Sequence, residues 1–218
     1  MAVDITIPVP WGNIRALQFG NTAGLPWLGL HGWLDNAHTW VNLAPHLPDN
    51  VCLVALDLPG HGQSDPLPAG VHYHDVEYVA HIHRAVTYLG WTRFTMLGHS
   101  MGGGLAALYT AAFPAMVSSL VMLDMVSYTP RLLPGTWPSI THRLRNTINK
   151  QEQLEKKLVT RGEVVYQTLE QAVQKMLKVK HFILNEIEKK YFQYSNAFSM
   201  NEKCVRTLIE RGLRRTEG

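Results

Sequence analysis

The sequence is poor in the features that mark secreted, membrane and nucleic-acid-binding proteins. Its two cysteines, Cys52 and Cys204, are too few for a disulfide framework. Charged residues make up 17% of the chain and the net charge is only +3, which does not indicate a nucleic-acid partner. The N-terminal stretch MAVDITIPVPWG has no basic segment and no long apolar run, so we expect no signal peptide and no membrane span. These absences predict a cytoplasmic protein with reduced thiols.

What the chain does contain fits an ordinary folded domain with an added segment. Hydrophobic residues make up 46% of its 218 residues, which is enough for a packed core. Residues 1–127 alternate short apolar runs with helical patterns, whereas residues 128–218 begin with a Pro-rich connection and continue as amphipathic helices. We therefore expect a core over 1–127 and a connection with a helical cap over 128–218.

Four short apolar runs predict the sheet of that core. They read PWLGL, VCLVAL, RFTML and SSLVML, and segments with helical spacing separate the later ones. None alternates polar with apolar residues, which is typical of parallel strands covered by helices on both faces. Binding sites in such sheets form at the carboxyl ends of the strands. Polar or glycine residues follow all four runs there: His31-Gly32, Asp57, Gly98-His99-Ser100 and Asp124.

One motif at that edge indicates chemistry. Gly98-His99-Ser100-Met101-Gly102 fits the pattern G-x-S-x-G, and it lies between a predicted strand and a predicted helix. In that context the serine occupies a sharp turn, and glycine at positions 98 and 102 avoids clashes with the neighbouring backbone. The motif predicts that Ser100 is a nucleophile exposed at the top of the sheet. The alternative interpretation is a structural turn.

Acyl transfer also needs donors for the oxyanion that forms when the nucleophile attacks a carbonyl group. The N–H of Met101, directly after the serine, is the first candidate. The run that ends in His31-Gly32-Trp33 is expected to lie beside the strand of Ser100, so the N–H of Trp33 is the second. We expect His31 to brace this loop. His99 is a poor base, because adjacent residues on such a turn point apart.

Four stretches together resemble the α/β-hydrolase superfamily: HGWLDN, DLPGHGQSD, GHSMGG and LVMLD, in this order. The stretch LHGWLDN and the Trp-rich segment before it are most similar to the serine hydrolase-like (Kraken-like) protein family. The resemblance implies an α/β-hydrolase fold and serine esterase or thioesterase chemistry on a small-molecule ester-type substrate. It implies no cofactor and no metal, and it suggests peroxisomal or perinuclear vesicles as an alternative location. By resemblance, Asp57 and Ser64 brace the loop DLPGHGQSD.

The sequence departs from the family pattern in the base and the acid, which should follow the serine. Only two histidines follow Ser100, His142 and His181, and neither comes after a predicted strand. Asp124 matches an acid position used by some relatives and is the candidate acid. We therefore expect the chain to lack the final core strands and to be inactive or impaired. Trp137 and Met176 are candidates to line the substrate site in the cap.

Two classes of function remain open. The first is a serine hydrolase, and the second is a non-catalytic protein of the same fold that binds a ligand or partner. A metal site is disfavoured, because positions i and i+2 of a helix do not share a face and no H-E-x-x-H spacing occurs. The histidines concerned are His72, His74, His81 and His83. Serine at position 100 also argues against carboxylate-nucleophile chemistry in the same fold.

Overall fold

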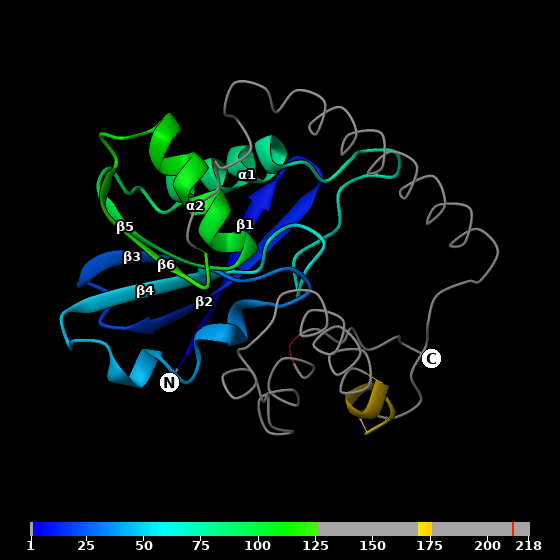
Figure 1. Cartoon of the computed structure of the whole chain (residues 1–218), viewed down its shortest axis with the longest axis horizontal. Coiled ribbons are helices and arrows are strands. Elements are labelled where there is room, and N and C mark those ends of the chain that lie inside the picture. Colours follow the sequence, from blue (N-terminus) through cyan, green and yellow to red (C-terminus); the bar gives the residue numbers. More distant parts are fainter. Residues whose placement is uncertain (1, 126–169, 176–210, 212–218) are drawn as a thin grey trace, which may run out of the picture.

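The computed structural model describes residues 2–125, residues 170–175 and residue 211 (Figure 1). Within this part the strands are β1 (Val3–Val9), β2 (Gly12–Gly20), β3 (Leu25–Leu30), β4 (Val51–Leu56), β5 (Phe94–His99) and β6 (Val117–Leu123). The longer α-helices are α1 (Asp75–Tyr88) and α2 (Met101–Ala112), and residues 170–175 are also helical. Two short 3₁₀ helices follow β3, η1 (Ala37–Trp40) and η2 (Ala44–His46).

The predicted, mostly parallel sheet is confirmed. The described strands form one sheet in the order β1-β2-β4-β3-β5-β6. Strands β4, β3, β5 and β6 run parallel, whereas β1 and β2 pair antiparallel and extend the sheet at one side. Leu30 at the end of β3 pairs with Leu56 on one neighbour and with Gly98 on the other. The carboxyl ends of β3, β4 and β5 therefore meet at one edge.

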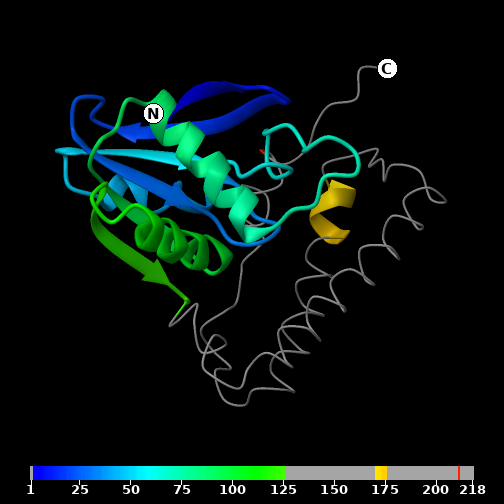
Figure 2. The same cartoon turned by 90° about the horizontal axis from the view of Figure 1, so that it is seen from above.

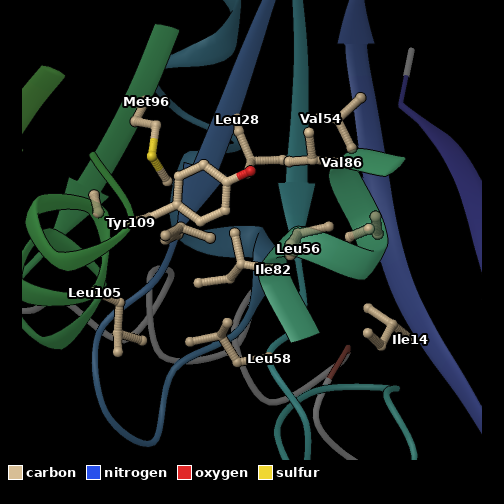
Figure 3. Close-up of a cluster of buried hydrophobic side chains, with 14 of the residues drawn as sticks. Ile14, Leu28, Val54, Leu56, Leu58, Ile82, Val86, Met96, Leu105 and Tyr109 are labelled. Carbon is tan, nitrogen blue, oxygen red and sulfur yellow. The ribbon is translucent and has the colours of Figure 1, made fainter. Parts of the chain in front are cut away.

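Helices α1 and α2 cover one face of the sheet (Figures 1 and 2). The larger hydrophobic core consists of side chains from these two helices and from the sheet. Figure 3 shows its centre, where Tyr109 of α2 lies among strand residues such as Leu28 and Met96 and near Ile82 of α1. The central strand β4 is buried along its whole length. Strong apolar burial on this face holds the sheet against the two helices and so fixes where β5 passes into α2.

The other face of the sheet carries a second, smaller core. Strand residues such as Phe19, Leu53 and Leu97 pack with Ala37 and Trp40 of η1. Cys52 lies in the first core and is buried, as its apolar surroundings in the sequence predict. The loop that follows β3 contains the short 3₁₀ helices η1 and η2, and the side chain of Asn36 caps η1 by accepting the N–H of His38.

Several predictions concern residues outside the described ranges. They include the boundary near residue 127, the helical cap over 128–218 apart from residues 170–175 and 211, and the single residues Trp137, His142, Met176, His181 and Cys204. Within the described ranges, the structure has no helix that is both long and apolar enough to cross a membrane.

Candidate functional site

Ser100 lies between the end of β5 and the start of α2, as the motif predicts. Its backbone has φ 50° and ψ −116°, in a region that L-residues rarely adopt. The chain reverses sharply there, and two hydrogen bonds hold the turn. The Ser100 N–H donates to the carbonyl of Leu123 on β6 (2.9 Å), and the Gly104 N–H donates to the Ser100 carbonyl (3.1 Å).

The glycines on either side of Ser100 are required by space. A Cβ on Gly102 would lie 2.3 Å from the carbonyl oxygen of Leu30 and 2.6 Å from that of His31. A Cβ on Gly98 would lie 2.4 Å from the carbonyl oxygen of Gly102. Such contacts are with backbone atoms, which cannot move aside as the end of a side chain can. The loop after β3 and the start of α2 therefore pack in direct backbone contact, as the sequence predicts for this turn.

The loop after β3 brings Trp33 to the same edge as Met101. Asp35 donates its N–H to the carbonyl of Gly32 (3.1 Å), which closes a turn with Trp33 and Leu34 at its tip. Met101 is the first residue of α2, where backbone N–H groups have no partner within the helix. The structure thus brings together the two segments whose N–H groups are the predicted oxyanion donors.

His31 is fully buried beneath this loop, and both of its ring nitrogens are engaged. Nε2 accepts the N–H of Leu58 (3.0 Å), so Nδ1 carries the proton and donates it to the carbonyl of Gly32 (2.7 Å). Burial, followed by the nearby charge of His61, lowers the pKa of His31 to about 3. The ring is therefore neutral at pH 7 and braces the loop, as predicted from the sequence.

This buried histidine predicts a loss of stability in mild acid. The folded pKa of His31 is below that of the unfolded chain, so its stabilising contribution is present above about pH 6.5 and is lost as the pH falls towards 3. Between pH 7 and pH 5 the free energy of unfolding should fall by about 2 kcal/mol from this residue. Burial also lowers the pKa of His61 and His81, which adds to the effect.

Chemical denaturation at pH 7 and pH 5 measures this difference. Burial raises the pKa of Asp57, which makes the protein more stable as the pH falls and so opposes the effect of His31. The slope of the free energy of unfolding against pH must therefore be compared between the wild type and His31→Gln. His46→Gln, which removes an exposed histidine, is the matched control and should keep the wild-type slope. Equal slopes for all three proteins would contradict the assignment of acid sensitivity to His31.

Asp57, the residue after β4, is completely buried and ties three segments together. Its Oδ1 accepts the N–H of Ala37 at the start of η1 (2.7 Å), and its Oδ2 accepts the N–H of Gln63 (3.0 Å). The same Oδ2 lies 2.8 Å from Nε of Arg211, a side chain only 3% exposed. The Ser64 hydroxyl donates to the Asp57 carbonyl (2.5 Å) and accepts the N–H of Arg15. The bracing expected of Asp57 and Ser64 is therefore present.

His99 and Asp124 lie on neighbouring strand ends beside the serine. Nε2 of His99 is 3.9 Å from Oδ2 of Asp124, and the two side chains are 30% and 54% exposed. A Cβ on Gly32 would lie 3.0 Å from His99 Nδ1, so the ring also rests against the loop after β3. The structure thus places Asp124 at the site edge, as predicted, with His99 as its nearest basic neighbour among the described residues.

Unusual backbone conformations gather at this edge. Among the described residues, the non-glycine residues with positive φ are Leu34 (59°), Ser100 (50°) and Asp124 (55°). Each follows the end of a parallel strand: β3, β5 and β6 respectively. Such conformations cost of order 1–3 kcal/mol each and cluster at functional sites. Their location marks the carboxyl edge around Ser100 as the candidate site.

Other features lie away from this edge. The four histidines considered for metal binding have separate contacts: His72 faces His74, His81 packs on Trp11, and His83 stacks on Phe113. No group of three potential metal ligands occurs among the residues that the structure describes. A cavity of about 510 Å³ is lined by residues such as Phe19, Val41 and Val51, at the amino end of β4. It lies at the opposite edge of the sheet from Ser100.

Comparison with known proteins agrees with this geometry. The family model for the alpha/beta hydrolase fold matches residues 28–187, which include the loop after β3 and the turn at Ser100. The chain belongs to the α/β-hydrolase fold family. A hypothetical protein from Pseudomonas aeruginosa has a similar solved structure, with a TM-score of 0.75 and 28% sequence identity, covering 99% of this chain and 67% of that one.

Curated relatives of this α/β-hydrolase include proteins named serine hydrolase-like. The one from Danio rerio is 40% identical over 185 residues, which cover 85% of this chain and 55% of that protein. The one from Homo sapiens is 44% identical over 121 residues, covering 56% of this chain and 60% of that protein. The chain thus spans little more than half the length of these relatives. The resemblance stated from the motifs is confirmed at the level of the family.

Two contacts of the site could not be found from the sequence. Arg211 meets Asp57 across a separation of 154 residues, and no local pattern marks an arginine that will be buried. The approach of His99 to Asp124 depends on the pairing of β5 with β6, in which His99 is opposite Leu123. The left-handed backbone of Leu34 was also missed, since leucine is not typical of such a position.

Proposed function

We propose that this α/β-hydrolase is a serine hydrolase that cleaves ester-type bonds, with Ser100 as its nucleophile. The observation that carries the proposal is the conformation of Ser100 itself. Its φ of 50° is an unfavourable, left-handed value. The residues at positions 98 and 102 must be glycine, because a Cβ added to either would lie 2.3–2.4 Å from a backbone oxygen. A turn of ordinary structural purpose would place glycine or asparagine at such a φ, without the backbone cost.

In the proposed reaction, Ser100 Oγ attacks the carbonyl carbon of the substrate and its proton passes to a histidine base. The N–H groups of Met101 and Trp33 stabilise the negative oxygen of the tetrahedral intermediate. The leaving alcohol or thiol departs with the proton, and an acyl-enzyme remains. Water then attacks the acyl carbon, which releases the acid and restores Ser100. Asp124 is the candidate acid that would orient the base.

Among the described residues, no imidazole forms a hydrogen bond with the Ser100 hydroxyl. Both nitrogens of His31 are engaged, and His99 rests between Gly32 and Asp124. This observation supports a second candidate function, a non-catalytic protein that binds a ligand at the same edge. The two candidates differ in whether Ser100 reacts covalently.

Labelling with a serine-directed fluorophosphonate distinguishes them. We expect the probe to attach to Ser100, located by mass spectrometry of the labelled peptide, and Ser100→Ala to remain unlabelled. Ser119→Ala, which removes an exposed serine on β6, is the matched control and should be labelled like the parent. The reaction is best measured on the longest form in which this chain occurs. Equal labelling of the parent and Ser100→Ala would contradict the nucleophile assignment.

A further inference from the structure

The turn at Gly32–Asp35 carries two exposed apolar side chains at the same edge of the sheet as the proposed nucleophile. Trp33 is 67% exposed and Leu34 is 51% exposed, although the residues around them, such as Gly32 and Ala37, are buried. The hydrogen bond from Asp35 N–H to the Gly32 carbonyl makes Leu34 the third residue of the turn. The φ of Leu34 is 59°. Some types of turn require a positive φ at their third residue.

Leucine is a poor choice for that backbone. Positions with positive φ at the third residue of a turn favour glycine or asparagine, and a bulky L-residue there is strained by of order 1 kcal/mol. The side chain does not repay this strain by packing in the core, since half of it is exposed to solvent. Neither the turn nor the core therefore explains why residue 34 is leucine.

The base of the turn is fixed, so the position of its tip is defined. Gly32 lies against the ring of His99, the neighbour of Ser100, and the His31 ring donates to the Gly32 carbonyl. Further along, the N–H of Ala37 is held by the buried Asp57 carboxylate. The parallel pairing of Leu30 with Gly98 places the whole turn next to the start of α2. Trp33 and Leu34 therefore project from a rigid support at the edge that holds Ser100.

We propose that Trp33 and Leu34 form an apolar wall that contacts the chain of the acyl group, so that the substrates are esters of medium-length apolar acids. This inference rests on the proposed function, because it assumes that the substrate carbonyl lies at Ser100. Each buried methylene group contributes about 0.8 kcal/mol, or roughly fourfold in affinity. Longer acyl chains should therefore bind more tightly, until the chain extends past the two side chains.

Binding to the Ser100→Ala protein tests the wall without requiring turnover. The probes are p-nitrophenyl acetate and p-nitrophenyl octanoate, and their dissociation constants are measured by quenching of tryptophan fluorescence. We expect octanoate to bind at least about tenfold more tightly than acetate. In Ser100→Ala/Leu34→Gly this preference should fall by about tenfold, while the affinity for acetate should change less than about twofold.

Two further variants separate the wall from trivial explanations. Leu34→Asn should lose the octanoate preference like Leu34→Gly, which excludes glycine flexibility as the cause. Both variants should be at least as stable to heat as the parent, because the backbone strain at residue 34 is relieved. Val76→Ala removes an apolar side chain that is 76% exposed on α1 and should leave the preference unchanged. An unchanged preference in both Leu34 variants, a loss in Val76→Ala, or no binding of either ester would overturn the inference. Failure of the proposed function would appear separately, as absent labelling of Ser100.

Discussion

Replacing Arg211 by methionine is expected to lower the free energy of unfolding by about 3–5 kcal/mol. The change leaves the buried Asp57 carboxylate without its charged partner, and removing one member of a buried ion pair is costly for that reason. Burial already raises the pKa of Asp57 while Arg211 is present, so the variant should shift it further upwards. A protonated Asp57 would also hold the Ala37 and Gln63 N–H groups less strongly.

Arg211 offers its own control, because its second partner is exposed. Nη1 lies 3.1 Å from Oδ1 of Asp4, whose side chain is 56% exposed, so Asp4→Asn should cost less than about 1 kcal/mol. Denaturant unfolding of Arg211→Met, of Asp57→Asn and of the double variant measures the interaction free energy between the two buried side chains. The double variant should be more stable than the sum of the single effects predicts. If Arg211→Met cost no more than Asp4→Asn, the buried pair would not contribute to folding.

The fold was predictable because its signals are local. The uninterrupted apolar run Val51–Leu56 requires cover on both faces, and the structure buries it on both. Ser100 and its glycines were predictable because the sharp strand-to-helix turn restricts the residues at positions 98 and 102. The edge itself followed from parallel pairing, which places His31, Asp57 and Asp124 at the carboxyl ends of the parallel strands β3, β4 and β6 of one sheet.

The unpredicted parts of the site depend on contacts between distant segments. Whether Arg211 is a solvated or a buried arginine depends on where the chain returns after more than 150 residues, and no periodicity encodes that. Leu34 was missed for a different reason. The residues HGWLDN carry no sign of which one adopts positive φ, since Gly32 and Asn36 are the residue types usually chosen. Local rules fail there because leucine is not a residue type that this backbone conformation favours.

The 218-residue chain is expected to hydrolyse an activated ester only at a residual rate, about 10³–10⁴-fold above the uncatalysed reaction. A serine hydroxyl is a weak nucleophile until a positioned base accepts its proton. His31 cannot do so, because Nε2 already accepts the Leu58 N–H and Nδ1 donates to the Gly32 carbonyl. What remains is the contribution of the proposed oxyanion donors and of binding, which falls orders of magnitude short of normal turnover.

The two histidines that follow Ser100 in the sequence provide the decisive test. The double variant His142→Gln/His181→Gln should hydrolyse p-nitrophenyl butyrate with the same kcat/KM as the parent chain, because neither follows a strand of the core in the predicted order. His46→Gln controls for the general effect of removing a histidine. Ser100→Ala should lower the residual rate by less than about tenfold. The members of a catalytic triad act as a unit, so removing the nucleophile costs little when the base is already absent. A fall of 10²-fold or more in the double variant would identify one of the two histidines as the base, and the chain would then contain a complete nucleophile and base.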